Sequence, residues 1–91
     1  MSKDAGHPMD IEAKIRSYIL ENFMYSKDES KLPRDLSLID NGIMDSTGAL
    51  ELVGFIEEHF AVKVDDTDLI PDNFDSVAKI TGYIIRRQSG S

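Results

Sequence analysis

Apolar residues recur with the spacing of an α-helix in three separate stretches of the chain, and this pattern constrains the fold more than any other feature. It predicts helices over residues 10–24, 46–60 and 76–87. A short helical turn is expected over residues 66–70, ended by Pro71. Only one short run, FAVKVDD, is strand-like. In 91 residues these elements predict one all-α domain, a small four-helix bundle with three main helices, a short third helix and a long first loop.

The ends of the chain and the long connection complete this outline. Residues 1–9 are expected to form a flexible leader and residues 88–91 a flexible tail, which leaves residues 10–87 as the folded domain. The connection over residues 25–45 is too long for an ordinary link between helices, and apolar residues punctuate its second half. We therefore expect it to pack back onto the core. The predicted core includes five apolar residues of the later helices: Leu52, Phe55, Ile56, Ile80 and Ile84.

Negative charge is concentrated in the middle of the chain. Residues 40–75 contain ten Asp and Glu residues against one basic residue, Lys63, which gives this segment a net charge of −9. Such a surface disfavours nucleic acid as a partner and suits basic proteins, whose approach it would steer. The alternative is that the charge only keeps a small domain soluble. No apolar run approaches the roughly 18 residues of a membrane span, and the first residues lack a secretory signal. We therefore expect a cytoplasmic monomer that does not insert into membranes.

Ser46 stands where the second long helix is predicted to begin, directly after Asp45. A catalytic serine needs a base within hydrogen-bond reach. His59 lies nearly four helical turns away, about 20 Å along the axis, and His7 lies in the expected leader. The sequence contains no nucleophile elbow, metal-binding motif or phosphate-binding glycine loop. It therefore predicts a protein that is not an enzyme and has no catalytic residue or metal site of its own.

The pair Asp45-Ser46 admits two interpretations. Asp and Ser are both preferred at the N-cap of a helix, so the pair can be a capping device alone. If Asp45 is the cap, however, Ser46 occupies the first helical position, with its hydroxyl exposed at the positive end of the helix, which attracts phosphate. An exposed serine there is a suitable attachment point for a phosphodiester that another enzyme forms.

The segment LSLIDNGIMDSTGALELVGFIEEHF and the later segment VDDTDLIPDNFDSVAKITGYI together resemble the acyl and peptidyl carrier proteins. That family carries a Gly-x-Asp-Ser-Leu type motif at the start of its second helix. A Glu-Leu pair follows five residues after the serine, and a Glu-x-x-Phe-like end closes the helix. Here Asp45 and Ser46 are followed by Glu51 and Leu52, and the helix closes with EEHF. The resemblance covers residues 10–87, nearly the whole predicted domain.

The resemblance implies a function. In that family a magnesium-dependent phosphopantetheinyl transferase moves 4′-phosphopantetheine from coenzyme A to the serine, here Ser46, beside Asp45. The thiol at the end of this arm carries acyl or aminoacyl groups as thioesters between loading and transferring enzymes of fatty acid, polyketide or nonribosomal peptide biosynthesis. The carrier itself catalyses nothing, and its acidic second helix docks on basic enzymes. The residues expected to contact such partners are Met44, Thr47, Glu51, Glu57 and Glu58.

Thr47 and Gly48 depart from the family pattern, because the residue after the serine is usually leucine. Relatives use that leucine as an apolar contact with partner enzymes, so the departure bears on recognition by the standard fatty-acid enzymes. The cargo stays open between fatty acyl, polyketide and amino acid groups, and the run LIPDNFDSV is closer to carriers of amino acids or specialised acyl groups. A second function also stays open: an unmodified all-α adaptor that binds a basic partner through its acidic second helix.

Overall fold

The computed structural model describes residues 8–90, so most of the expected leader, with His7, and also Ser91 lie outside the described residues. Its α-helices follow in the order α1 (Pro8–Ile19), α2 (Ser46–Phe60), α3 (Pro71–Phe74) and α4 (Val77–Gly90). A π-helical turn, Leu20–Met24, extends α1, and 3₁₀ turns lie at Glu29–Lys31 and Asp66–Asp68. No strand occurs within residues 8–90. The predicted all-α four-helix fold, with a short third helix and a long first loop, is confirmed.

The position of the short helix differs from the prediction. Residues 66–70 form only the 3₁₀ turn Asp66–Asp68, and α3 begins at Pro71 instead of a helix ending there. Proline suits a helix start because it lacks the N–H that the first turn leaves unpaired, and because its φ is already close to the helical value. The predicted placement of the short helix before Pro71 is therefore wrong, because proline can begin a helix as well as follow its end.

The outer helices are longer than predicted. α1 begins at Pro8, ahead of the predicted start at Asp10, and α4 continues to Gly90, past the predicted end at Arg87. A proline in the first turn accounts for the early start, and no proline follows Arg87 to stop the last helix. The helices thus reach into the expected leader and tail, while the division of the chain into leader, domain and tail stays a prediction.

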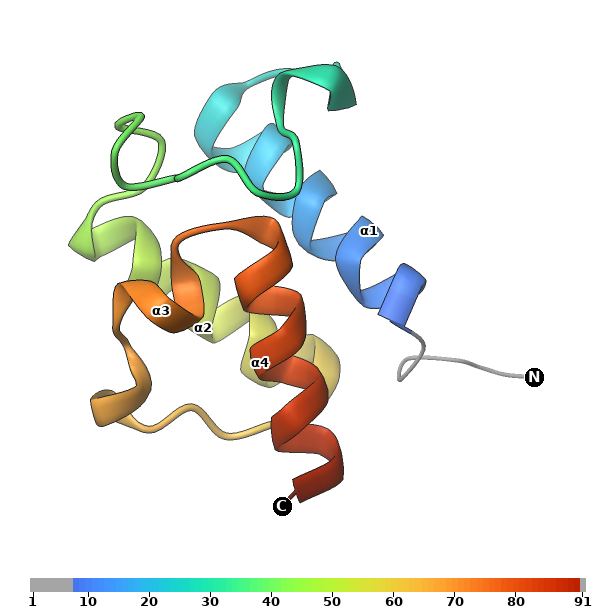
Figure 1. The fold of residues 1–91 in the computed structure, drawn as a ribbon, viewed down its shortest axis with the longest axis vertical. Helices are drawn as coiled ribbons and strands as arrows, with labels where there is room; N and C mark the ends of the chain where they lie inside the picture. Colours follow the sequence, from blue (N-terminus) through green and yellow to red (C-terminus); the bar gives the residue numbers. More distant parts are fainter. Residues whose placement is uncertain (1–7, 91) are drawn as a thin grey trace.

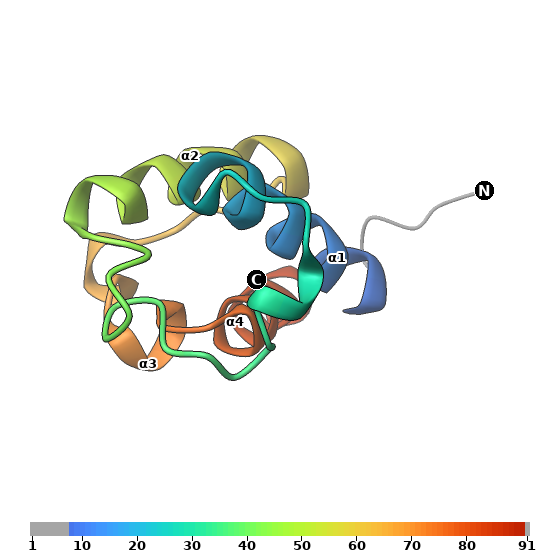
Figure 2. The same ribbon diagram turned by 90° about the horizontal axis from the view of Figure 1, so that it is seen from above.

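The helices and the long loop enclose one core. α1 packs against α4, and α3 packs against α4. Two perpendicular views show α3 and the first turn of α2 at the same end of the molecule, and the view from above shows the green loop running between them (Figures 1 and 2). Fully buried side chains come from α1, the loop, α2 and α4, and they include Ile11, Ile15, Leu38, Leu52, Ile56, Ile80 and Ile84.

Phe55 is the predicted core residue that is only partly buried. Its ring stacks on that of Tyr18 with centroids 4.2 Å apart. The ring of His59, also on α2, has its centroid 4.2 Å from that of Phe55. The other four predicted core residues have no exposed surface. Phe55 therefore covers the edge of the core between α1 and α2 instead of filling its centre.

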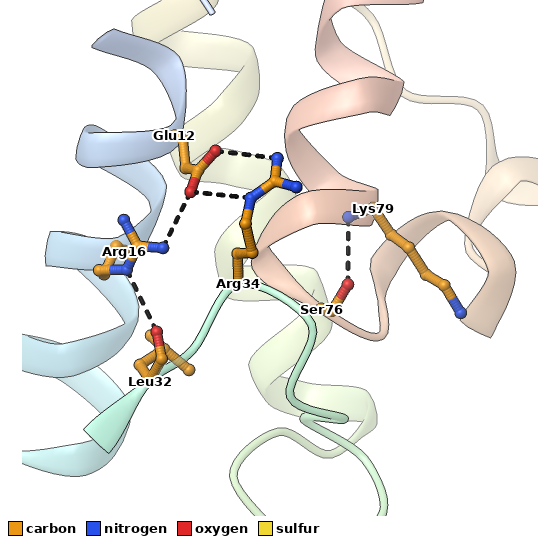
Figure 3. A network of polar contacts seen from close by, with 6 residues as sticks. All are labelled: Glu12, Arg16, Leu32, Arg34, Ser76 and Lys79. Atoms are coloured by element: carbon orange, nitrogen blue, oxygen red, sulfur yellow. Dashed lines mark hydrogen bonds and ion pairs between the residues drawn. The ribbon is translucent and has the colours of Figure 1, made fainter. Parts of the chain in front are cut away.

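Polar contacts tie the long loop to α1, as Figure 3 shows. Arg34 donates to both carboxylate oxygens of Glu12, at 3.1 and 3.3 Å, and Arg16 donates to the same carboxylate at 2.9 Å. Arg16 also donates to the carbonyl oxygen of Leu32 at 3.2 Å. The hydrogen bond from Arg34 is the main cause that lowers the pKa of Glu12. Because the folded state favours the charged carboxylate, this contribution to stability is lost as the pH falls through the lowered pKa.

The start of α4 is capped by Ser76, although Asp and Ser are both preferred caps and Asp75 stands directly before it. Its Oγ accepts a hydrogen bond from the backbone N–H of Lys79 at 3.1 Å (Figure 3). The alternative, Asp75, directs its carboxylate to the long loop instead. Asp75 is therefore free of the capping role and joins two segments that are far apart in the sequence.

Replacing Gly54 with alanine should raise the free energy of unfolding by about 1 kcal/mol, because glycine is a poor helix former. A Cβ at this exposed position in α2 would meet no atom within 4 Å. Gly42→Ala is the matched control, and it should destabilise the protein because Gly42 has a φ of +69°. Urea denaturation of both variants measures the two changes. A loss of stability in Gly54→Ala would contradict this account of α2.

Candidate functional site

Asp45 is the N-cap of α2. Its backbone is extended, with φ −116° and ψ −170°, and its Oδ1 accepts a hydrogen bond from the N–H of Gly48 at 2.8 Å. Ser46 is therefore the first helical residue, and it is exposed together with Thr47. The hydroxyl-bearing residue thus stands at the end of α2 where unpaired N–H groups carry partial positive charge.

Gly48 is buried, and its lack of a side chain allows a close approach of neighbouring groups. A Cβ built there would lie 3.4 Å from Phe23 Cζ, from Met44 Cγ and from Asp45 Oδ1. Phe23 belongs to the π-helical turn that extends α1. The end of α1 therefore covers the first turn of α2 from the inside, which leaves no room for a large side chain at position 48. This packing role of Gly48 was not foreseen from the sequence.

A cleft of about 460 Å³ opens beside Ser46, between the end of the long loop, the start of α2 and α3. Ser46 and Asp45 are among the residues that line it. A group attached to the oxygen of Ser46 would therefore start at the wall of this cleft. Most of the other lining side chains are apolar, and they include Ile39, Met44, Ala49, Leu69, Ile70 and Phe74.

The sequence pointed to Ser46 but not to the cleft beside it. The loop wall contributes Ile39 and the wall before α3 contributes Ile70, and these side chains are 45% and 44% exposed. The sequence signal that could have indicated them is a large apolar residue beside turn residues: Ile39 precedes Asn41-Gly42, and Ile70 precedes Pro71. That the two walls meet depends on packing between segments far apart in the sequence, which no local pattern reveals.

Tyr83 of α4 holds the segment that leads into α3. Its hydroxyl donates to Oδ2 of Asp68 at 2.7 Å, and Nδ2 of Asn73 donates to the carbonyl oxygen of Asp68 at 2.9 Å. Burial, followed by the hydrogen bond to Asp68, raises the pKa of Tyr83 from 10.0 to about 12. The stability that this protonated phenol contributes is therefore complete below its ordinary pKa and is lost as the pH rises through the raised value.

The five residues expected to contact partners have different surroundings. Thr47, Glu51 and Glu58 are exposed. Glu57 is partly buried, and its Oε2 accepts a hydrogen bond from the N–H of Val64 at 2.9 Å, so it also fixes the chain after α2.

Met44 is only 5% exposed, and it lines the cleft from the chain just before α2. A direct contact of Met44 with a partner enzyme is disfavoured by this burial. Its burial is compatible with a contact to a group that is attached to Ser46 and enters the cleft. For Met44 we therefore predict a contact with such a group instead of a contact with a partner enzyme.

Within residues 8–90, no histidine stands beside Ser46. His59 lies near the other end of α2, where its Nδ1 is 3.2 Å from the carbonyl oxygen of Phe55. In the described part of the chain, no group of three or more His, Cys, Asp or Glu residues is arranged to hold a metal ion. Nor does any helix among residues 8–90 have the length and apolar character needed to span a membrane. The hydroxyl of Ser46 is exposed at the first position of α2.

Comparison with known proteins found relatives among carrier proteins. A scan against protein-family models found no match. The chain is 36% identical over 78 residues to an acyl carrier protein of Thermotoga maritima, with 86% of this chain and 91% of that protein covered. It is 35% identical over 72 residues to D-alanyl carrier proteins of Streptococcus mutans and of Streptococcus sanguinis, with 79% of this chain and 87% of each relative covered. The likeness therefore extends over most of the domain.

Proposed function

Since this chain belongs to the carrier-protein family that includes acyl carrier and D-alanyl carrier proteins, we propose that Ser46 receives a 4′-phosphopantetheine arm. The observation that carries the proposal is the exposed position of Ser46 as the first residue of α2, with Asp45 as the cap before it. The chain is a carrier and catalyses no reaction itself. A phosphopantetheinyl transferase with magnesium would join the oxygen of Ser46 to the phosphopantetheinyl phosphate of coenzyme A. The pyrophosphate bond of coenzyme A would break, adenosine 3′,5′-bisphosphate would leave, and a base of the transferase would take the serine proton.

The surroundings of Ser46 fit such a group. The positive end of α2 favours the negative charge of a phosphodiester, and the carboxylate of Asp45 is engaged by the N–H of Gly48. When bound, the arm supplies a thiol that carries the cargo as a thioester. The residues of this chain position the attachment oxygen, offset the charge beside it and offer the apolar cleft to whatever the arm carries.

The cleft favours an acyl cargo over an aminoacyl cargo. Its walls are mostly apolar, with side chains such as Met44, Leu69 and Phe74. The charged residue among those that line it is Asp45, whose Oδ1 already accepts a hydrogen bond from the N–H of Gly48. Burial of an unpaired charge is costly, whereas burial of alkyl groups is favourable. We therefore propose that the chain resembles the acyl carrier relative in its cargo more than the D-alanyl carrier relatives, and that the cleft shelters part of an acyl group.

Mass spectrometry tests the proposed modification directly. The protein is incubated with coenzyme A, magnesium and a broad-specificity phosphopantetheinyl transferase, and its intact mass is measured. We expect the mass of one phosphopantetheine to be added and no second addition. A protein that stays unmodified while a known carrier in the same tube is converted would refute the proposal.

Exposed acidic residues on α2 are the proposed docking surface for the transferase and for other basic partner enzymes. Exchanging both Glu51 and Glu58 for lysine should lower the rate of modification about ten-fold at low salt, because such charges steer encounter. The effect should shrink as salt is added, and stability should change by less than about 1 kcal/mol. Glu29→Lys is the matched control, since Glu29 is equally exposed but lies in the first loop.

Initial rates of modification at several salt concentrations measure this effect. If the double variant and Glu29→Lys are slowed alike, the charge of α2 serves solubility alone. Glu57 is left unchanged in this test because its reversal would also remove the hydrogen bond to Val64. A net hydrogen bond contributes about 1 kcal/mol, so slower modification of a Glu57 variant would mix docking with folding.

A further inference from the structure

Asp75, at the junction of α3 and α4, binds three consecutive residues of the long loop. The hydroxyl of Ser37 lies 2.9 and 2.8 Å from the two carboxylate oxygens, and the N–H of Ile39 donates to Oδ1 at 2.9 Å. The N–H of Leu38 donates to the carbonyl oxygen of Asp75 at 2.7 Å. One residue thus joins two segments that are more than thirty positions apart in the sequence.

These bonds connect the two walls of the cleft beside Ser46. Ile39 lines the cleft from the loop, and Phe74, which precedes Asp75, lines it from α3. Ile39 is 45% exposed, so core packing alone does not fix its position, whereas Leu38 beside it is fully buried. The hydrogen bond from the N–H of Ile39 to Oδ1 of Asp75 therefore contributes to holding this side chain near α3.

Hydrogen bonds within residues 37–41 hold the loop turn that carries Ile39 together. Ser37 Oγ accepts a hydrogen bond from the N–H of Asp40 at 3.0 Å, and its carbonyl oxygen accepts one from Nδ2 of Asn41 at 2.7 Å. Gly42, with a φ of +69°, then turns the chain back toward α2. The bonds from Ser37 and Ile39 to Asp75 therefore hold this turn beside the junction of α3 and α4, together with the backbone bond from Leu38.

The carboxylate of Asp75 has no role in capping α4, because Ser76 accepts the hydrogen bond from Lys79. The side-chain hydrogen bonds that Asp75 makes in the structure go to the loop. We propose that Asp75 is a positioning residue that, through Ser37 and Ile39, sets the width of the cleft and thereby the shelter given to an apolar acyl group held on Ser46. This inference rests on the proposed function of Ser46 and names a determinant of cargo selection within it.

The test uses Asp75→Ala and the milder Ser37→Ala, with Ser30→Ala as the control. Ser30 Oγ donates to Asp28 Oδ1 at 2.6 Å in an exposed turn of the same loop, so its removal breaks a similar serine–aspartate contact away from the cleft. Each protein is loaded on Ser46 with acetyl- or octanoyl-phosphopantetheine from the corresponding acyl coenzyme A. The rate at which hydroxylamine cleaves each thioester is then measured, and circular dichroism checks that each variant is folded.

In the wild type we expect the octanoyl thioester to be cleaved more slowly than the acetyl thioester. Asp75→Ala should raise octanoyl cleavage about five-fold, which corresponds to the loss of one typical hydrogen bond from the closed state, and should leave acetyl cleavage unchanged. Ser37→Ala should act in the same direction, and Ser30→Ala should behave as the wild type. If Asp75→Ala does not fold, Ser37→Ala decides.

Three results would overturn the inference: equal protection of both cargoes in the wild type, an unchanged octanoyl rate in the folded variants, or the same increase in Ser30→Ala. Hydrogen exchange at the amide of Ile39 confirms that the contact with Asp75 is broken in the variant, so an unchanged rate counts against the proposal. Failure of the proposed function gives a different result, because Ser46 would then accept no acyl-phosphopantetheine at all.

Discussion

Replacing Ser46 with alanine should abolish modification completely, so that the mass of the protein stays unchanged after incubation with coenzyme A, magnesium and the transferase. The oxygen of Ser46 is the atom that would form the phosphodiester bond, and alanine has none. The residue is exposed at the first position of α2, and Asp45 makes the capping hydrogen bond. We therefore expect the free energy of unfolding to change by less than about 0.5 kcal/mol, as is usual for surface substitutions.

Thr47→Ala is the matched control for this experiment. It removes the neighbouring exposed hydroxyl of the same helical turn and should leave the addition of one phosphopantetheine intact. Equal labelling of Ser46→Ala and the wild type would move the attachment site elsewhere. If instead neither the wild type nor Thr47→Ala is labelled, the alternative of an unmodified adaptor that binds a basic partner through α2 becomes the better explanation.

The start of α2 could be predicted from the sequence because local chemistry determines it. Asp is a preferred cap, and a residue directly after the cap must occupy the first helical position. The structure bears out this arrangement for Asp45 and Ser46. The core positions Leu52, Ile56 and Ile80 could be predicted for a similar reason, since each recurs at helical spacing on one face.

The features that the sequence did not reveal all depend on contacts between distant segments. Phe23 covers Gly48 only because the π-helical turn brings the end of α1 against α2. Pro71 was taken to end a helix, although the same residue equally suits a helix start, and the chain before it settles as a 3₁₀ turn. Asp75 is of a type that often caps a helix, yet its carboxylate accepts a hydrogen bond from Ser37 of the long loop.

Charge on α2 illustrates a partial prediction. The sequence identified Glu51, Glu57 and Glu58 as one acidic group, but a helical pattern does not show which carboxylates are free. In the structure Glu57 accepts a hydrogen bond from Val64, while Glu51 and Glu58 are exposed. We therefore propose the exposed pair as the docking residues for a basic enzyme, because an exposed carboxylate can meet a partner without giving up a bond in the fold.

Exchanging Thr47 for leucine should improve recognition by a general transferase of the fatty-acid type. The resemblance noted in the sequence implies that a leucine after the serine makes an apolar contact with partner enzymes, and full burial of a leucine side chain contributes about 1.5–3 kcal/mol. Since each 1.4 kcal/mol corresponds to about ten-fold, we expect kcat/KM for modification to rise at least about ten-fold. Thr47 is exposed in the first turn of α2, so folding should hardly change.

Leu50 gives this experiment its matched counterpart. It lies one turn after Thr47 on α2 and is 62% exposed, so it already offers a partner an apolar side chain near Ser46. Leu50→Thr should lower kcat/KM with the same general transferase, because it removes the apolar contact that the chain retains. Kinetics of Thr47→Leu, Leu50→Thr and the wild type, with urea denaturation of each, separate recognition from stability. If Thr47→Leu brings no gain, the apolar contact is made elsewhere, and Thr47 is not what distinguishes this chain from carriers with a leucine there.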